Sequence, residues 1–435
     1  MTSTGGVKCW GGNRFGQLGD GSNGNQATRT RPVDVVGLGS GVVAVSAGLS
    51  FTFVGHSCAL TEVGGVKCWG YNGDGQLGNQ TLDDSDVPVD VFGLQSGVAA
   101  IATGAASSCA MLSSDGSVVC WGYNLHGQLG DDRWNCLEQC SVPVSVCASG
   151  ATGPCTESFS NILRDSVGLA VGGLSACARV EAAPVLAGLF TIVQTGAKCW
   201  GHNGRGQVGD GSTTQRDTPV DVEGLAVGGV GEVSSGLSHS CAVMTNGTVQ
   251  CWGIAARGRL GNGTTGQDNF SSIPVIVCSD QACSSSLTDI VHVVAGDEHT
   301  CAVTSAGTVK CWGANGRGQL GVPRSNQGEH LTPVDLVLPP KATATPTAIP
   351  PTGTAPPNTP IATPDETAQG LVGDANCDGS VNAVDAALVL QFSASLVGSL
   401  LCQDEADVNT DGSVSSIDAA LILQHTGGLI TLPLA

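Results

Sequence analysis

The chain of 435 residues carries 37 acidic and 17 basic residues, which gives a formal net charge of −20. Nucleic acids and anionic membrane surfaces bind clusters of Lys and Arg, so this balance argues against both as the main partner. The 64 glycines, 19 cysteines and 4% aromatic residues favour short strands, tight turns and disulfides. We therefore expect a mainly β protein from an oxidising compartment. The sequence contains no run of about 18 apolar residues, so it predicts no membrane span.

The first motif in chain order is Cys-Trp-Gly, followed by a glycine turn related to Gly-Gln-Leu-Gly. Its shortest interval, from Cys68 to Cys120, is 52 residues. Periods of about 40–50 residues are typical of propeller blades. Repetition indicates architecture rather than a single binding site. The six copies start at Cys9, Cys68, Cys120, Cys199, Cys251 and Cys311.

Each copy is surrounded by further strand patterns. The sequence HSCALTEVGGVKCWG, residues 56–70, predicts two short strands around a glycine turn. Strands of the type PVDV (residues 32–35) and GVVAVSAG (residues 41–48) follow downstream and supply two more. Four strands complete one blade.

These repeats resemble the regulator-of-chromosome-condensation family over residues 1–338. The resemblance implies an all-β propeller, with six recognisable repeat units here and seven blades in the full protein. It implies no single activity, because the family includes a nucleotide exchange factor for a small nuclear GTPase, β-lactamase inhibitor proteins and other repeat proteins. The acidic charge and the cysteines disfavour the exchange-factor role for this chain.

The cysteines fall into pairs that follow the repeats. Cross-strand neighbours lie within disulfide reach, so we expect one bridge in each of five hairpins. Three further pairs clip loops, although four converging thiolates at positions 136, 140, 147 and 155 would also suit zinc. The expected hairpin bridges are Cys58–Cys68, Cys109–Cys120, Cys177–Cys199, Cys241–Cys251 and Cys301–Cys311, and the loop clips are Cys136–Cys140, Cys147–Cys155 and Cys278–Cys283.

Cys9 alone has no predicted partner. The start MTSTGGVKCWG aligns with residues 241–253 so that Met1 falls on Met244, in the middle of a hairpin. We expect the partner of Cys9 and a signal peptide to lie upstream of Met1. In the alternative, the strand TPVDLVLP (residues 332–339) shares one blade with the N-terminal strands, but this supplies no cysteine.

The glycine turns and recurring histidines are interpreted as structural. The turns have neither the Lys-Ser/Thr of a phosphate loop nor a helix behind them, so their glutamines are expected to satisfy backbone groups. Histidines two residues before a hairpin cysteine recur from blade to blade, which favours a structural or funnel-lining role over catalysis. No nucleophile motif is present, and a glycosidase-like carboxylate pair stays open. The residues are Gln17, Gln76, Gln128, Gln207 and Gln319, with His56, His239 and His299.

Residues 339–370 form a Pro/Thr/Ala-rich linker, which should run extended as a semi-rigid spacer. Residues 371–435 contain two near copies of a twelve-residue loop with oxygen ligands at positions 1, 3, 5, 7 and 12 and glycine at position 6. A single match would also fit an Asx-rich turn. Two matches, each followed at the same distance by an Ala/Leu-rich helical pattern, predict calcium loops. The predicted calcium ligands are Asp374, Asn376, Asp378, Ser380 and Asp385, then Asp407, Asn409, Asp411, Ser413 and Asp418.

The duplicated loops resemble the dockerin family over residues 371–430. The resemblance implies a small α-helical, EF-hand-like domain that binds two calcium ions and docks onto a cohesin module of a scaffold or cell-surface protein. By position, the partner-reading residues are Ala383 and Val384 in one copy and Ser416 and Ile417 in the other. A Cys377–Cys402 disulfide would clip the two halves together.

Together these patterns predict an extracellular or cell-surface binding and assembly protein without catalytic residues. Its propeller would bind a protein or glycan ligand, and its dockerin would dock to a cohesin. The alternatives are a component of a polysaccharide-degrading complex and, less favoured, a guanine nucleotide exchange regulator.

Overall fold

The structure is a computed structural model, which describes residues 1–336 apart from residue 3 and several short segments. The chain divides into two compact units, Met1–Thr343 and Ala344–Ala435. The described residues all belong to the first unit. The segments outside the description are 25–26, 49–54, 133–138, 149–154, 156–160, 188–189, 227–228, 267, 323–327 and 337–435.

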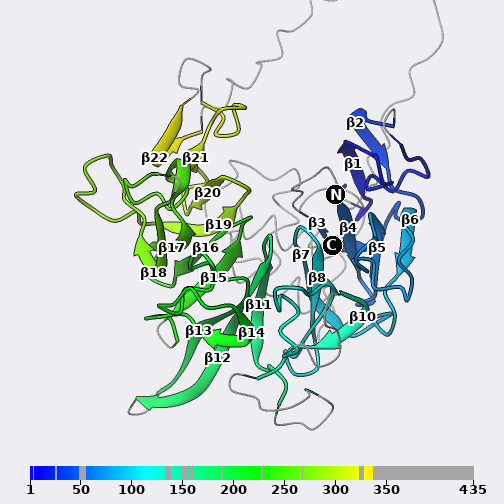
Figure 1. The fold of residues 1–435 in the computed structure, drawn as a ribbon, viewed down its shortest axis with the longest axis horizontal. Helices are drawn as coiled ribbons and strands as arrows, with labels where there is room; N and C mark the ends of the chain where they lie inside the picture. The colour runs from blue at the N-terminus through cyan, green and yellow to red at the C-terminus, as the bar shows by residue number, and fades with distance from the viewer. Residues whose placement is uncertain are drawn as a thin grey trace, which may run out of the picture. The chain divides into compact units, whose positions relative to one another are not determined.

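The described residues form one two-stranded and five four-stranded antiparallel sheets, which we call blades 1 to 6 in chain order (Figure 1). Blade 1 contains β1 (Lys8–Gly11) and β2 (Arg29–Asp34), and blade 2 contains β3 (Val42–Ala47), β4 (His56–Thr61), β5 (Val66–Gly70) and β6 (Ser85–Asp90). Blade 3 contains β7 (Val98–Thr103), β8 (Ser107–Leu112), β9 (Val118–Tyr123) and β10 (Gln139–Ser145).

Blades 4 to 6 repeat the same order of strands. Blade 4 contains β11 (Ser166–Val171), β12 (Ser175–Ala187), β13 (Phe190–Gly201) and β14 (Arg216–Asp221). Blade 5 contains β15 (Val230–Ser235), β16 (His239–Met244), β17 (Val249–Ile254) and β18 (Phe270–Ile276), with the short 3-10 helix η1 (Ala256–Gly258) after β17. Blade 6 contains β19 (Ile290–Ala295), β20 (His299–Thr304), β21 (Val309–Ala314) and β22 (Glu329–Asp335).

One detail of the predicted blade is corrected by the pairing. The strand of the type GVVAVSAG, β3 in the first example, pairs with the hairpin that follows it and not with the motif that precedes it. The first strands β3, β7, β11, β15 and β19 contact one another in succession. Sequence order alone did not show where one blade ends and the next begins.

The Cys-Trp-Gly strand has the same register in every blade. In blade 2, Lys67 pairs with Asp90 and Cys68 with Val89, and the register shifts before Gly70, which marks a β-bulge. Blades 1, 4 and 6 repeat the Lys–Asp pair, and the Lys67 ammonium lies 2.6 Å from the Asp90 carboxylate. Exposed pairs of this kind contribute little stability. The register that the blades share is therefore stabilised by buried contacts.

The apolar core lies between successive blades. Leu60, Val66 and Leu77 of blade 2 form one buried cluster with Ala110 and Trp121 of blade 3. Equivalent clusters join blade 3 to blade 4, blade 4 to blade 5 and blade 5 to blade 6. Each sheet thus buries its faces against its neighbours, as expected for the propeller architecture.

The hairpin cysteines lie directly opposite each other in register. Cys58 faces Cys68, and their Cα atoms are 4.1 Å apart in a disulfide. The same bond joins Cys177 to Cys199 at the base of the long hairpin β12–β13. The other disulfides among the described residues join Cys109 to Cys120, Cys147 to Cys155, Cys241 to Cys251, Cys278 to Cys283 and Cys301 to Cys311.

The zinc alternative for the cysteine cluster is not supported. Cys147 is bonded to Cys155, and Cys140 is also disulfide-bonded, so these thiols are not available as metal ligands. Cys136, the expected partner of Cys140, lies outside the described residues, as do Cys377 and Cys402.

The alternative of a shared blade is wrong. β22, which begins the strand TPVDLVLP, is the fourth strand of blade 6 and pairs with β21 rather than with blade 1. Among the described residues, β1 pairs only with β2, and Cys9 is free. The expected seventh blade stays a prediction, and the expected helical domain lies outside the described residues.

Candidate functional site

The glycine turns join each blade to the next through a tryptophan. The Trp69 indole N–H of blade 2 donates to the backbone carbonyl of Gln17 in the turn of blade 1, at 3.0 Å. The same bond recurs at all five seams between described blades, and the five tryptophans are at most 1% exposed. The remaining bonds run from Trp121, Trp200, Trp252 and Trp312 to the carbonyls of Gln76, Gln128, Gln207 and Arg259.

The last glycine of each turn makes room for this tryptophan. Gly130 has a φ of 68°, and a Cβ added there would lie 2.8 Å from the Trp200 indole nitrogen. Only glycine adopts this left-handed conformation at low cost and also allows such close approach. The turns are therefore structural contacts, in agreement with the interpretation against phosphate binding.

The predicted glutamines satisfy backbone groups inside their own turns. The Gln76 Oε1 atom accepts a hydrogen bond from the Asp74 N–H at 3.0 Å, and the other four glutamines repeat this contact. An asparagine in each of these turns adds a second internal bond, for example from the Leu77 N–H to Asn72 Oδ1 at 2.9 Å. These bonds make each turn rigid.

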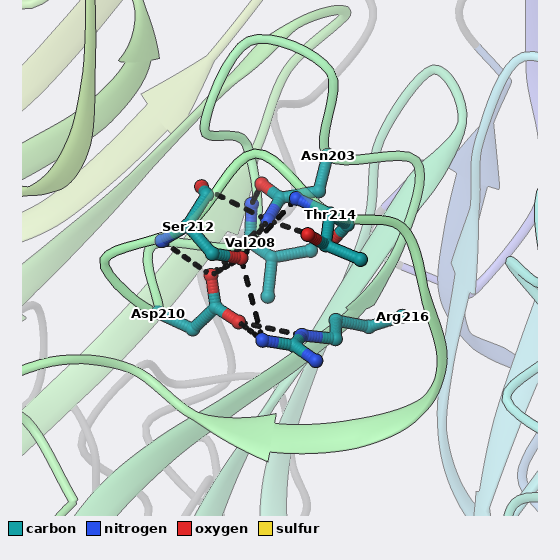
Figure 2. A network of polar contacts seen from close by, with 6 residues as sticks. All are labelled: Asn203, Val208, Asp210, Ser212, Thr214 and Arg216. Carbon is teal, nitrogen blue, oxygen red and sulfur yellow. Dashed lines mark hydrogen bonds and ion pairs between the residues drawn. The ribbon is translucent and has the colours of Figure 1, made fainter.

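Figure 2 shows how the turn of blade 4 is stabilised further. The Asn203 amide donates to Asp210, which in turn accepts from Ser212 and Arg216. Partial burial acts to raise the pKa of Asp210, but the hydrogen bonds from Ser212 and Arg216 outweigh it and lower this pKa below its ordinary value. The turn therefore stays charged and ordered at neutral pH.

Two of the recurring histidines are buried between blades. The His56 Nε2 atom lies 2.7 Å from Ser108 Oγ in the next blade, and His239 Nε2 lies 2.8 Å from Thr300 Oγ1. Burial lowers the pKa of His56 to about 4, so its imidazole is neutral at pH 7. These two side chains hold seams together, which matches the structural role expected for them. His299 is different because it lines a pocket.

The pocket beside His299 has a volume of about 1130 Å³. We call it the arginine pocket, because Arg14 from blade 1 and Arg257 and Arg317 from the turns of blades 5 and 6 line it. Asp297 and Glu298, in the turn between β19 and β20, supply its acidic groups. The other polar residues of the lining are Asn13, Gln17, Thr28, His299 and Gln319.

The arginine pocket lies where the repeat departs from its own pattern. Ala255 replaces the asparagine of the other turns, and Arg259 replaces the glutamine. Arg257 has a φ of 61°, a conformation that costs free energy for a residue with a side chain. Where the other copies of a repeat share one residue at a position, a copy with a different residue there is expected to have a functional role.

The replacement Arg259 organises the acidic side of the pocket. This nearly buried guanidinium donates to the Asp297 backbone carbonyl at 3.1 Å and lies 3.7 Å from the Glu298 carboxylate. Arg257 adds a second ion pair to Glu298 at 3.2 Å. Glu298 is therefore compensated from two sides.

Asp297 and the remaining arginines are less fully paired. The Asp297 Oδ1 atom is buried without a hydrogen-bond partner, and burial raises the pKa of this carboxyl. Burial likewise lowers the pKa of the neighbouring His299. With three arginines against two carboxylates, the pocket is locally cationic in a chain of net charge −20. It offers one buried acceptor and guanidinium groups to a ligand.

Two edge-on ring contacts join the turns of neighbouring blades. Phe15 of blade 1 packs against Tyr71 of blade 2, with ring centroids 5.2 Å apart, and His126 of blade 3 lies 5.0 Å from His202 of blade 4 in the same manner. The Arg14 guanidinium also lies 5.2 Å from the Phe15 ring centroid. Sequence reasoning missed both these contacts and the acidic pair of the pocket; comparison of the turns position by position was the available signal.

Comparison with protein-family models decides the identity of the repeats. The "Regulator of chromosome condensation (RCC1) repeat" is matched by two models, one at residues 4–54, 64–111, 199–243 and 246–303 and the other at 98–128, 232–259 and 290–319. Together the matched residues make up more than half of the chain. The chain belongs to the RCC1 repeat family.

Among curated relatives, this RCC1-repeat protein is 28% identical over 324 residues to the ultraviolet-B receptor UVR8 of Arabidopsis thaliana, covering 73% of this chain and 63% of that protein. It is 30% identical over 270 residues to the human E3 ubiquitin-protein ligase HERC2, covering 61% of this chain and 5% of HERC2. The chain thus spans less than two thirds of these relatives.

Solved structures show the same fold for the RCC1 repeats. Prp20p from Saccharomyces cerevisiae matches with a TM-score of 0.60 at 20% identity, covering 77% of this chain and 75% of that chain. Human WBSCR16 matches with a TM-score of 0.56 at 22% identity, covering 77% and 76%. These similarities establish a propeller-like architecture and carry no statement about activity.

The C-terminal part carries a second family match. A "Dockerin type I domain" is found at residues 372–425, and such domains bind calcium. The ten predicted calcium ligands and the four predicted partner-reading residues lie outside the described residues. Within the part of the chain that the structure describes, no helix has the length and hydropathy of a membrane span.

Proposed function

We propose that this RCC1-repeat protein is an extracellular or cell-surface binding and assembly protein. Its propeller binds an acidic glycan in the arginine pocket, and its dockerin binds two calcium ions and docks onto a cohesin. The disulfides of the described blades support a location outside the reducing cytosol. The dockerin match supports the cohesin partner.

The cationic charge of the arginine pocket carries the ligand assignment. Arg14 comes from blade 1 and Arg317 from blade 6. Neither has a carboxylate partner within ion-pair distance among the described residues. Guanidinium groups bind carboxylates by paired hydrogen bonds. The buried Asp297 Oδ1 atom requires a donor, which a sugar hydroxyl supplies. A uronate oligosaccharide offers both groups in one molecule.

Binding of defined oligosaccharides to the full chain tests this proposal. We expect calorimetry to detect tetragalacturonate binding and to detect none with cellotetraose, which has the hydroxyls but no carboxylates. Binding should weaken as the salt concentration rises, because the attraction is screened. Equal affinity for both oligosaccharides, or binding of neither, would overturn the ligand assignment.

Two variants and a control locate the site. Arg317→Gln and Arg14→Gln should each weaken tetragalacturonate binding about tenfold, the loss of roughly one charge-assisted hydrogen bond. Arg31→Gln is the matched control, since Arg31 is an exposed arginine outside the pocket. An equal loss in the control would show non-specific attraction instead of a built site.

A role as a component of a polysaccharide-degrading complex is the second candidate, and the dockerin match favours it. In this case the propeller delivers the complex to its substrate without cleaving it. A reducing-sugar assay on polygalacturonate should show no product above the buffer control. Release of reducing ends that Asp297→Asn abolishes would instead identify the pocket as catalytic.

A further inference from the structure

A second pocket lies where the first strands of blades 4, 5 and 6 begin. Its volume is about 330 Å³, which is within the range of small-molecule sites. Three valines and a leucine of β11, β15 and β19 form the apolar part of its lining, and Arg179, Glu232 and His292 supply its polar side chains. The arginine pocket includes Leu237 and Asp297, which follow the ends of β15 and β19. The two pockets therefore lie at opposite ends of these strands.

The three polar residues of this second pocket depart from the pattern of the repeat. In blades 2 to 6, the third residue of the first strand pairs with a residue of the second strand, and blades 2 and 3 have apolar residues at both positions. Each of blades 4, 5 and 6 places one of the three polar residues in this pair. The five pairs are Ala44–Leu60, Ala100–Met111, Gly168–Arg179, Glu232–Val243 and His292–Val303. Departures that meet in one pocket are expected at a functional site.

Gly168 makes room for the side chain of Arg179. A Cβ added at Gly168 would lie 3.3 Å from the Arg179 Cβ atom and 3.5 Å from its Nε atom. The Arg179 Nη2 group donates to the backbone carbonyl of Val167 at 3.0 Å, which holds the half-buried guanidinium over its own blade. Among the described residues, no carboxylate lies within ion-pair distance of Arg179. Its positive charge is therefore positioned but not compensated.

Glu232 is positioned by the neighbouring blade. Its Oε2 atom accepts a hydrogen bond from the Val293 N–H at 3.2 Å and lies 3.3 Å from His292 Nδ1. Both contacts use one carboxylate oxygen, so the other oxygen is left for a ligand. Arg179 and Glu232 line the same pocket, yet their charged groups are more than 4.0 Å apart. A molecule that carries both a negative and a positive charge would compensate both residues at once.

We propose that the second pocket binds a free α-amino acid with an apolar side chain. The carboxylate of the amino acid binds the Arg179 guanidinium, which is suited to planar anions. Its ammonium group donates to the Glu232 carboxylate, and its side chain contacts the valines and Leu169 of the lining. All of these residues belong to blades 4 to 6, so the proposal is independent of the glycan assigned to the arginine pocket.

Binding of L-leucine to the full chain tests the proposal, and saturation-transfer NMR measures it. Three analogues each lack one feature: 4-methylpentanoate lacks the ammonium group, 3-methylbutylamine lacks the carboxylate, and glycine lacks the apolar side chain. We expect saturable binding of L-leucine and at least about tenfold weaker binding of each analogue, since each loses one favourable contact. Absence of L-leucine binding, or equal binding of L-leucine and either singly charged analogue, would overturn the proposal.

Two variants assign each charge of the ligand to its residue. Glu232→Gln keeps an oxygen that can accept from the Val293 N–H, so the contact between the blades is retained. It should weaken L-leucine binding about tenfold and leave 4-methylpentanoate binding unchanged, because that analogue has no ammonium group. Arg179→Gln should weaken L-leucine binding by a similar factor and leave 3-methylbutylamine binding unchanged.

Matched controls separate a built site from general attraction between charges. Arg31→Gln and Glu223→Gln change exposed residues outside the second pocket and should bind L-leucine as the unmodified chain does. Arg179 also holds the Val167 carbonyl, so Glu232→Gln decides the outcome if Arg179→Gln unfolds. Equal losses of L-leucine binding in the controls, or a Glu232→Gln variant that binds L-leucine as tightly as the unmodified chain, would refute the assignment.

Discussion

The Trp121 indole N–H donates to the backbone carbonyl of Gln76 in the preceding blade, at 2.7 Å and fully buried. The Cys-Trp-Gly motif of one blade thus contacts the preceding blade, because its tryptophan fills the glycine turn of the blade before it. The stability of the propeller therefore depends on seams between blades more than on single sheets.

Trp121→Ala should be strongly destabilising. It removes a large, fully buried side chain from the cluster that joins blades 2 and 3, and such truncations cost about 3–5 kcal/mol. Trp10→Ala is the matched control, since Trp10 occupies the same motif position but is 63% exposed and should cost under about 0.5 kcal/mol. Denaturant unfolding measures both, and similar losses would contradict the seam model.

Substitution of two left-handed glycines separates backbone strain from close packing. Gly93 and Gly130 both have positive φ, but a Cβ at Gly93 meets nothing within 4 Å, whereas one at Gly130 meets the Trp200 indole. Gly93→Ala should cost about 1–2 kcal/mol, the price of the conformation alone. Gly130→Ala should cost clearly more in the same unfolding measurement. Equal costs would show that the contact is unimportant.

The stability of the propeller should fall as the pH is lowered from 6.5 to 4. The pKa of His56 is about 4 in the folded state because of burial, and about 6.5 in the unfolded state. The unfolded state therefore binds the proton first, so the stabilisation is complete above pH 6.5 and is lost on acidification. This one histidine accounts for about 3 kcal/mol of the loss.

A variant pair checks the assignment to His56. His56→Ser places at this position the residue that blade 3 has at Ser107, and should reduce the loss of stability between pH 6.5 and 4. His292→Ser changes an exposed histidine that lies 3.3 Å from the Glu232 carboxylate, and it should not reduce this loss of stability. The seam role of His56 fails if both variants follow the profile of the unmodified protein.

Calcium binding should depend on the first ligand of each loop in the dockerin. Asp374→Ala combined with Asp407→Ala removes position 1 from both predicted loops and should abolish the calorimetric signal for calcium, together with cohesin docking. Asp365→Ala in the linker is the control and should bind as the unmodified chain does. Calcium binding retained by the double variant would disprove the loop assignment.

The repeat sequence was sufficient to predict the local structure of each blade. Cys58 and Cys68 were predicted as cross-strand partners because a glycine turn fixes the register of a short hairpin. The turn glutamines were predicted to satisfy backbone groups because no ligand chemistry accompanied them, and the bond to Gln76 shows this. Both properties depend on neighbours close in sequence.

The arginine pocket was decided only by tertiary structure. Arg14 is more than 240 residues from Arg257 in sequence, and no local pattern brings them to one pocket. The same holds for the assignment of β3 to the following sheet and for the Trp121 bond to Gln76, since pairing between repeats depends on how sheets stack.

The sequence by itself determined the blade, its disulfides and its turns through short-range geometry. Only the packing of blades against one another decided the seams, the buried His56 and the charged pocket, because those contacts join residues far apart in the chain.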